Sequence, residues 1–301
     1  MEKILKVLPR PLILITVAIG LSACVPIGCV PIDIDQRKTI HQTNEMLFSE
    51  QKNFEADKVE PVYIPGTGVI GVVVLSVIAN HVNAVNERRI KSRTKDVDGE
   101  VYKKLFNRNL AYELKEIKWL NLDKSSIKDP VRYGEKRTLV TNFPKDGDTM
   151  IYVDLSYQLT PNIYNALFIK ANVEAYRKNG PKATLIYKNY FGYIHILEKH
   201  KNAEEYLDIW FNNNANLIKQ HMSIAAHRLS KAIVSDIQDS NKHPDTKHPT
   251  NVFYLDFGSS GLIQQAGYLE GKTDNKYVIR TKLGGILFTD EQVKRKHNWR
   301  E

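Results

Sequence analysis

Three consecutive segments in which apolar and polar residues alternate constrain the fold more than any other feature of the chain. They run from Ile151 to Leu159, from Leu167 to Ala175 and from Thr184 to Leu197. A period of two residues is typical of β-strands with one buried face. Only the short breaks Thr160 to Asn162 and Asn179 to Pro181 punctuate them, and short turns require antiparallel neighbours.

Helical periodicity is found on both sides of these strands. Asp98 is positioned to cap a helix whose apolar residues recur at helical spacing as far as Trp119. A second helical pattern covers Ala203 to Ile237, and we expect the run Asn212 to Asn214 to break it into two helices. Three further strands are predicted at Val252–Phe257, Gly267–Lys272 and Tyr277–Leu283.

These elements predict an α+β fold in which helices pack on one face of an antiparallel sheet. The polar stretch 121–148 is interpreted as loops around one short strand at Thr138 to Thr141. Tyr152, Tyr176 and Tyr190 are expected on the more exposed sheet face, where they either pack under another layer or contact a partner or glycan. With 42% hydrophobic and 26% charged residues among 301, the chain has the material for a core, which excludes global disorder.

The chain begins with a pattern typical of a secretory signal peptide. Lys3, Lys6 and Arg10 precede the apolar run Pro11 to Ala23, which is too short to span a bilayer as a helix. A basic segment, a short apolar segment and small residues at its end are the parts of such a signal. Residues 1–23 are therefore not expected to belong to the fold.

The end of this run, Leu21-Ser22-Ala23-Cys24, resembles the lipobox of bacterial lipoproteins. The resemblance implies cleavage between Ala23 and Cys24, a thioether from the Cys24 sulfur to diacylglycerol, and an acyl group such as palmitate on the new amino terminus. Several acyl chains make a permanent anchor. Because Val25 rather than Asp follows, the resemblance also implies the outer membrane of a Gram-negative bacterium. The alternatives are an ordinary cleaved signal with a chance cysteine, and an uncleaved anchor.

These patterns divide the chain into three parts. Residues 1–23 are predicted to be a lipoprotein signal peptide, residues 24–60 a lipidated tether, and residues 61–301 a single α+β domain that faces the periplasm. The tether is predicted because no helical or strand periodicity is sustained there. The order of elements is also similar to a loosely defined group of uncharacterised proteobacterial envelope lipoproteins, a similarity that implies no activity. Its marks are Gly66–Ala79, Leu159–Asn162 and Tyr187–Tyr193.

Two features near the amino terminus allow more than one interpretation. The apolar segment Val69 to Ala79 is too short to span a membrane. We interpret it as a buried core helix, with a buried strand second and a membrane-inserting or partner-packing segment as the functional alternative. Cys29 has no intramolecular disulfide partner if Cys24 is lipidated, so it is interpreted as a free thiol, with an intermolecular disulfide or a second acyl site as the alternative.

The charge of the chain is basic and unevenly distributed. Residues 1–23 hold three basic residues and one acidic residue, so the net charge of +9 falls to +7 on cleavage. A basic surface attracts anionic headgroups or wall polymer, and export makes nucleic acid an unexpected partner. A solvated face is the alternative interpretation. The residues proposed to contact an anion or partner are Arg88, Arg89, Lys91, Arg93 and Lys95, and a second cluster covers Lys294 to Arg300.

No complete catalytic or metal-binding pattern is found. The tightest pairs among the nine histidines are His195 with His200, His221 with His227, and His243 with His248, and none has the spacing of a metal site. Ser125 to Lys128 matches S-x-x-K but lacks the companion motifs of penicillin-recognising enzymes. Gly258 to Gly261 is interpreted as a turn, with an anion-binding nest as the alternative. No metal, cofactor or catalytic residue is predicted.

The leading hypothesis is therefore a lipid-anchored, noncatalytic cell-envelope protein that binds another envelope component. The partner is expected to be a protein, an anionic lipid or a wall polymer. One alternative is an envelope hydrolase whose catalytic residues come from distant positions, which spacing in a sequence does not reveal. Another is a membrane-active accessory component that acts through Val69 to Ala79.

Overall fold

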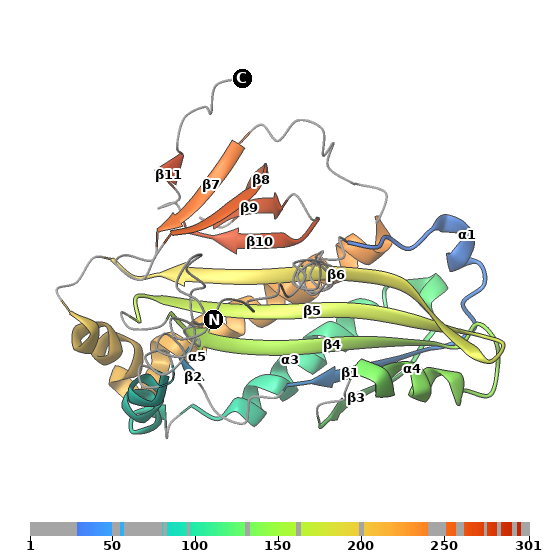
Figure 1. The fold of residues 1–301 in the computed structure, drawn as a ribbon, viewed down its shortest axis with the longest axis horizontal. Helices are drawn as coiled ribbons and strands as arrows, with labels where there is room; N and C mark the ends of the chain where they lie inside the picture. The colour runs from blue at the N-terminus through green and yellow to red at the C-terminus, as the bar shows by residue number, and fades with distance from the viewer. Residues whose placement is uncertain are drawn as a thin grey trace, which may run out of the picture.

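The computed structural model describes residues 29–49, 55–56, 80, 83–94, 97–129, 133–160, 164–198, 202–239, 251–256, 262–273, 276–281, 284–290 and 294–295. Within these residues the fold is α+β, as predicted (Figure 1). The strands form one sheet in the order β11-β7-β8-β9-β10-β6-β5-β4-β1-β3, with β2 paired to β4. The predicted signal peptide, Cys24 and the apolar segment Val69 to Ala79 lie outside the described residues.

The elements have the following bounds. The strands are β1 (Thr43–Phe48), β2 (Glu55–Ala56), β3 (Leu122–Lys128), β4 (Thr149–Leu159), β5 (Ala166–Asn179), β6 (Lys182–Ile196), β7 (Asn251–Asp256), β8 (Leu262–Thr273), β9 (Lys276–Thr281), β10 (Ile286–Thr289) and β11 (Lys294–Arg295). The helices are α1 (Ile34–Arg37), α3 (Gly99–Leu114), α4 (Tyr133–Thr141) and α5 (Ala203–Gln238), with a short 3₁₀ turn at Lys118–Leu120. Residues 83–91 are also helical.

The centre of the sheet is the predicted antiparallel meander of β4, β5 and β6. Val153 lies opposite Val173, and Ala171 lies opposite Phe191, so the inward-facing residues of the three strands are in register. Parallel pairs extend the sheet on both sides, because β1 runs parallel to β3 and β4, and β10 runs parallel to β6. The sheet is thus mainly antiparallel, with parallel contacts where segments distant in sequence join it.

The two long helices α3 and α5 cover one face of this sheet, as predicted. Figure 1 shows both behind the long strands. Asp98 caps α3 by accepting hydrogen bonds from the backbone nitrogens of Glu100 and Val101. Helix α5 is interrupted where the run of asparagines predicts a break, since residues 212–215 have non-helical dihedral angles. The core beneath includes Phe106, Leu110, Leu155, Tyr157, Trp210 and Leu229, all fully buried.

The short helix α4 adds a second layer on the opposite face, and it replaces the strand predicted at Thr138 to Thr141. Val140 packs in one cluster with Met150, Tyr152 and Tyr176. Tyr152 and Tyr176 are fully buried as a result, which favours the interpretation that another layer covers them. The Tyr152 hydroxyl also donates a hydrogen bond to the carbonyl oxygen of Lys136, 2.9 Å away.

The folded domain begins earlier in the chain than the predicted boundary at residue 60. Residues 43–48 form β1 in the interior of the sheet, between β3 and β4, and Leu47 is fully buried there. Val30 already pairs with Lys188 of β6 through two backbone hydrogen bonds of 2.9 Å. Most of the predicted tether that the structure describes is therefore part of the domain.

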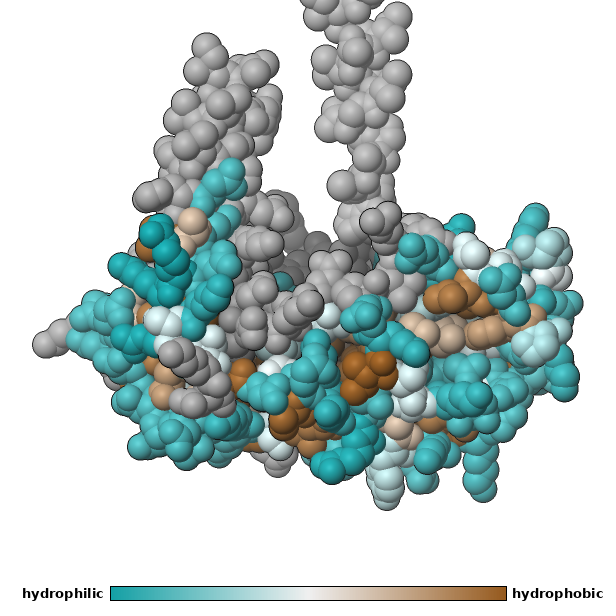
Figure 2. All heavy atoms as spheres, turned by 90° about the horizontal axis from the view of Figure 1, so that it is seen from below, coloured by the Kyte–Doolittle hydropathy of each residue, from teal (hydrophilic) through white to brown (hydrophobic). Residues whose placement is uncertain are grey.

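Exposed hydrophobic side chains on the described surface are few. The large ones are Ile34, Val101, Tyr112 and Leu139. Figure 2 shows that on the face viewed from below, hydrophobic residues gather in separate patches divided by hydrophilic ones. None of the helices in the described ranges has the length and apolar character needed to cross a membrane.

Candidate functional site

Polar side chains gather in two clusters where α5 crosses the sheet beside β6, β9 and β10. The first, called the Asp236 cluster, comprises Cys29, Tyr187, Asn189, Asp236, Glu270 and Arg280. The second, called the His195 cluster, comprises Tyr193, His195, His221, Lys276 and Asp290. Alternate residues of β6 and β9 contribute to both clusters, because a strand directs every second side chain to the same face.

Asp236 is held by three donors at the centre of the first cluster. The Tyr187 hydroxyl and the Asn189 amide donate to its Oδ2 at 2.7 and 2.6 Å, and Nη1 of Arg280 donates to its Oδ1 at 3.0 Å. Asp236 is buried, with 9% of its surface exposed. A buried carboxylate needs such partners, because desolvation of an unpaired charge is costly.

Arg280 joins Asp236 to a second carboxylate. Its Nε donates to Glu270, and its Nη1 also donates to the carbonyl oxygen of Gly284 at 3.2 Å. Burial opposes the charge on Arg280, but hydrogen bonds to Glu270 and Asp236 outweigh it and raise the pKa of the guanidinium above its ordinary value. Arg280 is thus a fixed cation whose Nε and Nη1 donors are engaged within the protein.

Cys29 borders the same network as a free thiol. Its Sγ donates to Oδ1 of Asn189 at 2.6 Å. Burial, together with the negative charge of Asp236, raises the pKa of Cys29 to about 11. The thiol therefore stays protonated at neutral pH, which disfavours it as a nucleophile.

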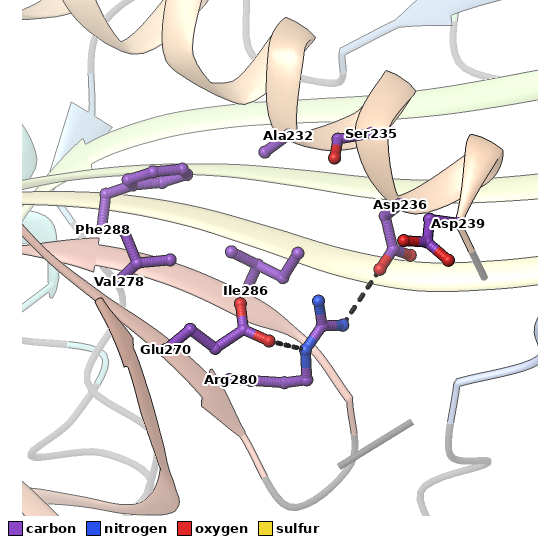
Figure 3. Close-up of a pocket in the computed structure, with 9 residues that line it drawn as sticks. All are labelled: Ala232, Ser235, Asp236, Asp239, Glu270, Val278, Arg280, Ile286 and Phe288. Atoms are coloured by element: carbon purple, nitrogen blue, oxygen red, sulfur yellow. Dashed lines mark hydrogen bonds and ion pairs between the residues drawn. The ribbon is translucent and has the colours of Figure 1, made fainter. Parts of the chain in front are cut away.

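A cavity of about 500 Å³ lies between the C-terminal turns of α5 and the strands β8, β9 and β10 (Figure 3). Its wall carries three carboxylates and one guanidinium beside an apolar surface. The helix contributes Ala232, Ser235, Asp236 and Asp239, and the strands contribute Glu270, Val278, Arg280, Ile286 and Phe288. Figure 3 shows Arg280 reaching from its strand to Glu270 on one side and to Asp236 on the helix.

In the His195 cluster, the carboxylate of Asp290 accepts hydrogen bonds from the side chains of His195 and Lys276. Nδ1 of His195 lies 2.9 Å from Oδ2 of Asp290, and Nζ of Lys276 donates to Oδ1. Burial opposes the charge of Asp290, but the hydrogen bond from His195 and the charge of Lys276 outweigh it and lower the pKa of Asp290 to about 2. Nζ of Lys276 also donates to the carbonyl oxygen of Ile194 at 2.8 Å, and burial, opposed by Asp290, lowers the pKa of this lysine below its ordinary value.

His221 of α5 completes the cluster by stacking on His195. Burial, with the adjacent His195 and Lys276, lowers the pKa of His221 to about 3, so its imidazole is neutral at physiological pH. The Tyr193 hydroxyl lies 2.8 Å from Nδ1 of His221, and a neutral ring with Nε2 protonated accepts that hydrogen bond. Burial, followed by the charge of Asp290, raises the pKa of Tyr193 above its ordinary value.

The His195–Asp290 pair is two parts of a hydrolytic triad. Within the described residues, however, no serine or cysteine side chain hydrogen-bonds to either histidine of the cluster. The same part of the chain contains no group of three metal-ligating side chains close enough to hold an ion.

The basic residues singled out from the sequence lie partly against acidic residues of α5. Arg93 pairs with Asp208 and, at 2.8 Å, with Glu204, and Arg89 lies 3.7 Å from Glu204. Arg88 and Lys91 are exposed, and Lys95 lies outside the described residues. Two of the five proposed contacts therefore already have anionic partners within the chain.

Other residues from the sequence patterns are distributed as follows. His227 is exposed, so it does not join His221 although both lie on α5. Ser125 of β3 donates to the carboxylate of Glu45 and accepts from Asn107, whereas Lys128 is exposed at the end of the strand. The segments that contain His200, His243, His248 and Gly258–Gly261 lie outside the described residues.

The sequence matches no protein-family profile and no curated protein. Among solved structures, it is similar to the hypothetical protein CT253 from Chlamydia trachomatis. The TM-score is 0.31 and the identity 11%, over 66% of this chain and 96% of that chain. A likeness of this size carries no argument about fold or function.

Proposed function

We propose that the chain is a lipid-anchored, noncatalytic protein of the cell envelope that binds another envelope component in the cavity beside α5. In this proposal Cys24 carries the lipid, and the domain faces the periplasm from the outer membrane of a Gram-negative bacterium. The cavity is the single observation that carries the binding role. It combines an apolar wall with charged groups, and its buried ionic groups are bonded to one another rather than aimed at a nucleophile.

The position of the domain relative to the anchor supports this proposal. Val30 is fixed to β6, and the chain from Cys24 to Val30 extends at most about 20 Å. Cys29 contacts Asn189, which in turn contacts the cavity residue Asp236. A lipid on Cys24 would therefore hold the cavity close to the membrane surface, where it can bind another component of the envelope.

Fractionation tests the anchor. Wild-type protein is expected in the outer-membrane fraction, and mass spectrometry is expected to find acyl chains on Cys24 and residues 1–23 removed. Cys24→Ser is expected to leave the membrane fraction. An unmodified Cys24 thiol in the native protein contradicts the anchoring part of the proposal.

Site-specific crosslinking tests the binding part. A photo-crosslinking residue at Ser235, an exposed residue that lines the cavity, is expected to capture one dominant envelope component in intact cells. The matched control carries the same residue at Ser223, an exposed serine of α5 outside the cavity wall. Equal capture from both positions, or none from Ser235, contradicts binding in the cavity.

The hydrolase remains a second candidate because His195 and Asp290 are in hydrogen-bond contact. A covalent serine-hydrolase probe tests it. Labelling that is lost in His195→Gln and kept in His227→Gln supports a hydrolase, whereas absence of labelling in the wild type supports the noncatalytic function.

A further inference from the structure

We propose that the cavity beside the C-terminal turns of α5 accepts a lysine or arginine side chain of a partner polypeptide. This inference rests on the proposed function, because it names the ligand chemistry of the same site. Three observations support it: the charge of the wall, the pairing of Arg280 with two carboxylates, and the apolar surface beside the charges.

The charge of the wall favours a cation. Asp236, Asp239 and Glu270 contribute three carboxylates against the single guanidinium of Arg280. The end of α5 adds little to this charge, because the carbonyl oxygen of its last residue, Gln238, accepts a hydrogen bond from Nη1 of Arg37 at 2.8 Å. A cavity lined by charge of one sign concentrates ions of the other sign.

Arg280 does not reverse this preference. Its Nε donates to Glu270 and its Nη1 donates to both Asp236 and Gly284. An anionic ligand would be left with Nη2 alone, on a guanidinium that is 9% exposed and already paired with two carboxylates. A cationic ligand needs no such displacement, because each carboxylate has lone pairs to accept further hydrogen bonds.

The remaining wall suits an aliphatic stem. Val278, Ile286 and Phe288 form one side of the cavity, and Ala232 faces them from α5 (Figure 3). Lysine and arginine side chains bury their methylene groups on apolar surface while their charged ends reach polar groups. Asp236 lies deep in the wall, whereas Asp239 and Ser235 are exposed at the helix end, so polar acceptors are present at more than one depth.

The size of the cavity and its position favour a side chain presented by a polypeptide. A volume of about 500 Å³ exceeds that of one side chain and leaves room for the backbone that carries it. With a lipid on Cys24, as the proposed function has it, the short connection from Cys24 to Val30 holds the cavity within reach of other polypeptides of the envelope.

Calorimetric titration of the detergent-solubilised mature protein tests the ligand chemistry. The probes are acetylated, amidated tripeptides Ala-X-Ala in which X is lysine, arginine, norleucine or glutamate, together with free n-butylamine, which has the stem and the single ammonium of a lysine side chain. The lysine and arginine peptides are expected to bind at least about tenfold more tightly than the norleucine peptide, and to weaken as salt is added. Binding of the glutamate peptide is expected to be weakest.

Three variants locate the binding in the cavity. Glu270→Gln and Asp239→Asn each remove one negative charge without loss of volume. Each is expected to lower the affinity for the lysine peptide about fivefold or more. Ala232→Leu is expected to block the cavity. Glu116→Gln changes an exposed residue after α3 and is expected to have no effect. Thermal unfolding of each variant shows whether a loss of binding reflects a loss of fold.

The outcomes separate this inference from the proposed function. Equal affinity for the lysine and norleucine peptides overturns a cationic ligand, and n-butylamine that binds as tightly as the lysine peptide overturns a polypeptide ligand. If the crosslinker at Ser235 captures a partner and the lysine peptide, added before irradiation, does not reduce that capture, the ligand chemistry is wrong and the proposed function stands. If the lysine peptide prevents the capture, both are supported.

Discussion

The imidazole rings of His195 and His221 stack with their centroids 3.6 Å apart and 15° between their planes. His195 belongs to β6 and His221 to α5, so the stack joins the helix to the sheet. Trp210 meets His195 edge-on at 5.9 Å and donates its indole hydrogen to the carbonyl oxygen of Tyr164. Stacking of two imidazoles so close to Lys276 is favourable only if positive charge does not accumulate, and the low pKa of His221 satisfies that condition.

The pKa of His221 makes the stability of the domain sensitive to acid. The pKa is about 3 in the folded protein against an ordinary value of 6.5, so between these values the unfolded chain binds a proton that the folded protein does not. Stability therefore falls as pH falls from 6.5 towards 3, by up to about 1.4 kcal/mol per pH unit. His221→Phe is expected to reduce this slope in urea unfolding at pH 7, 6, 5 and 4, whereas His227→Phe leaves it unchanged. An unchanged slope in His221→Phe contradicts the assignment.

Glu45 is expected to have the opposite pH dependence. It lies in β1 with 1% of its surface exposed, and burial, opposed by the Ser125 hydrogen bond, raises its pKa to about 8. The folded protein keeps the proton that the unfolded chain releases near pH 4.5, so stability falls as pH rises from about 4.5 to 8 and is lowest above that range. Glu45→Gln is expected to increase the free energy of unfolding at pH 9 by about 2–4 kcal/mol. Asp123→Asn, exposed on β3, is the control and is expected to change little.

Arg280 is expected to be essential to the stability of the Asp236 cluster. Arg280→Met leaves the buried carboxylate of Asp236 with only the Tyr187 and Asn189 donors, and we expect a loss of about 3 kcal/mol. In the double variant Arg280→Met, Asp236→Asn, the uncompensated charge is gone, so the loss is expected to be smaller than the sum of the two single losses. Urea denaturation of the four proteins measures this coupling. Additive losses show that the two side chains do not stabilise each other.

The apolar periodicity of the sequence predicted the elements whose buried residues are apolar. It missed elements that also have polar residues at buried positions. The alternation in β4 to β6, the Asp98 cap and the break in α5 are all local signals. In β1, by contrast, the polar residues Thr43 and Glu45 are buried along with Leu47 and Phe48, so polarity does not follow burial, and the strand was interpreted as a tether. Helix α4 presents few apolar residues, with Val140 the one in the core clusters. A strand prediction at its end was therefore wrong.

The candidate site was less predictable than the fold, because its residues come from separate elements. His195 and His221 each stood out in the sequence, but they were grouped with the near neighbours His200 and His227 instead of with each other. Asp290 and Lys276 carry no local pattern at all. Only the pairing of β6 with β10, and of β10 with β9, brings them together with His195.

Gly284 is expected to be required where the β9–β10 connection meets Cys29. Its φ is +92°, and a Cβ built there would lie 2.7 Å from Sγ of Cys29. Gly284→Ala therefore combines an unfavourable backbone conformation with a close contact, and we expect a loss of about 2 kcal/mol or more in urea unfolding. Cys29→Ala in the same chain is expected to recover only part of this loss, because it removes Sγ but leaves the Cβ of residue 29, 2.8 Å from the added Cβ, and the backbone strain. Gly271→Ala is the matched control, since no atom lies within 4 Å of its added Cβ. Equal effects at the two glycines contradict this account of the turn.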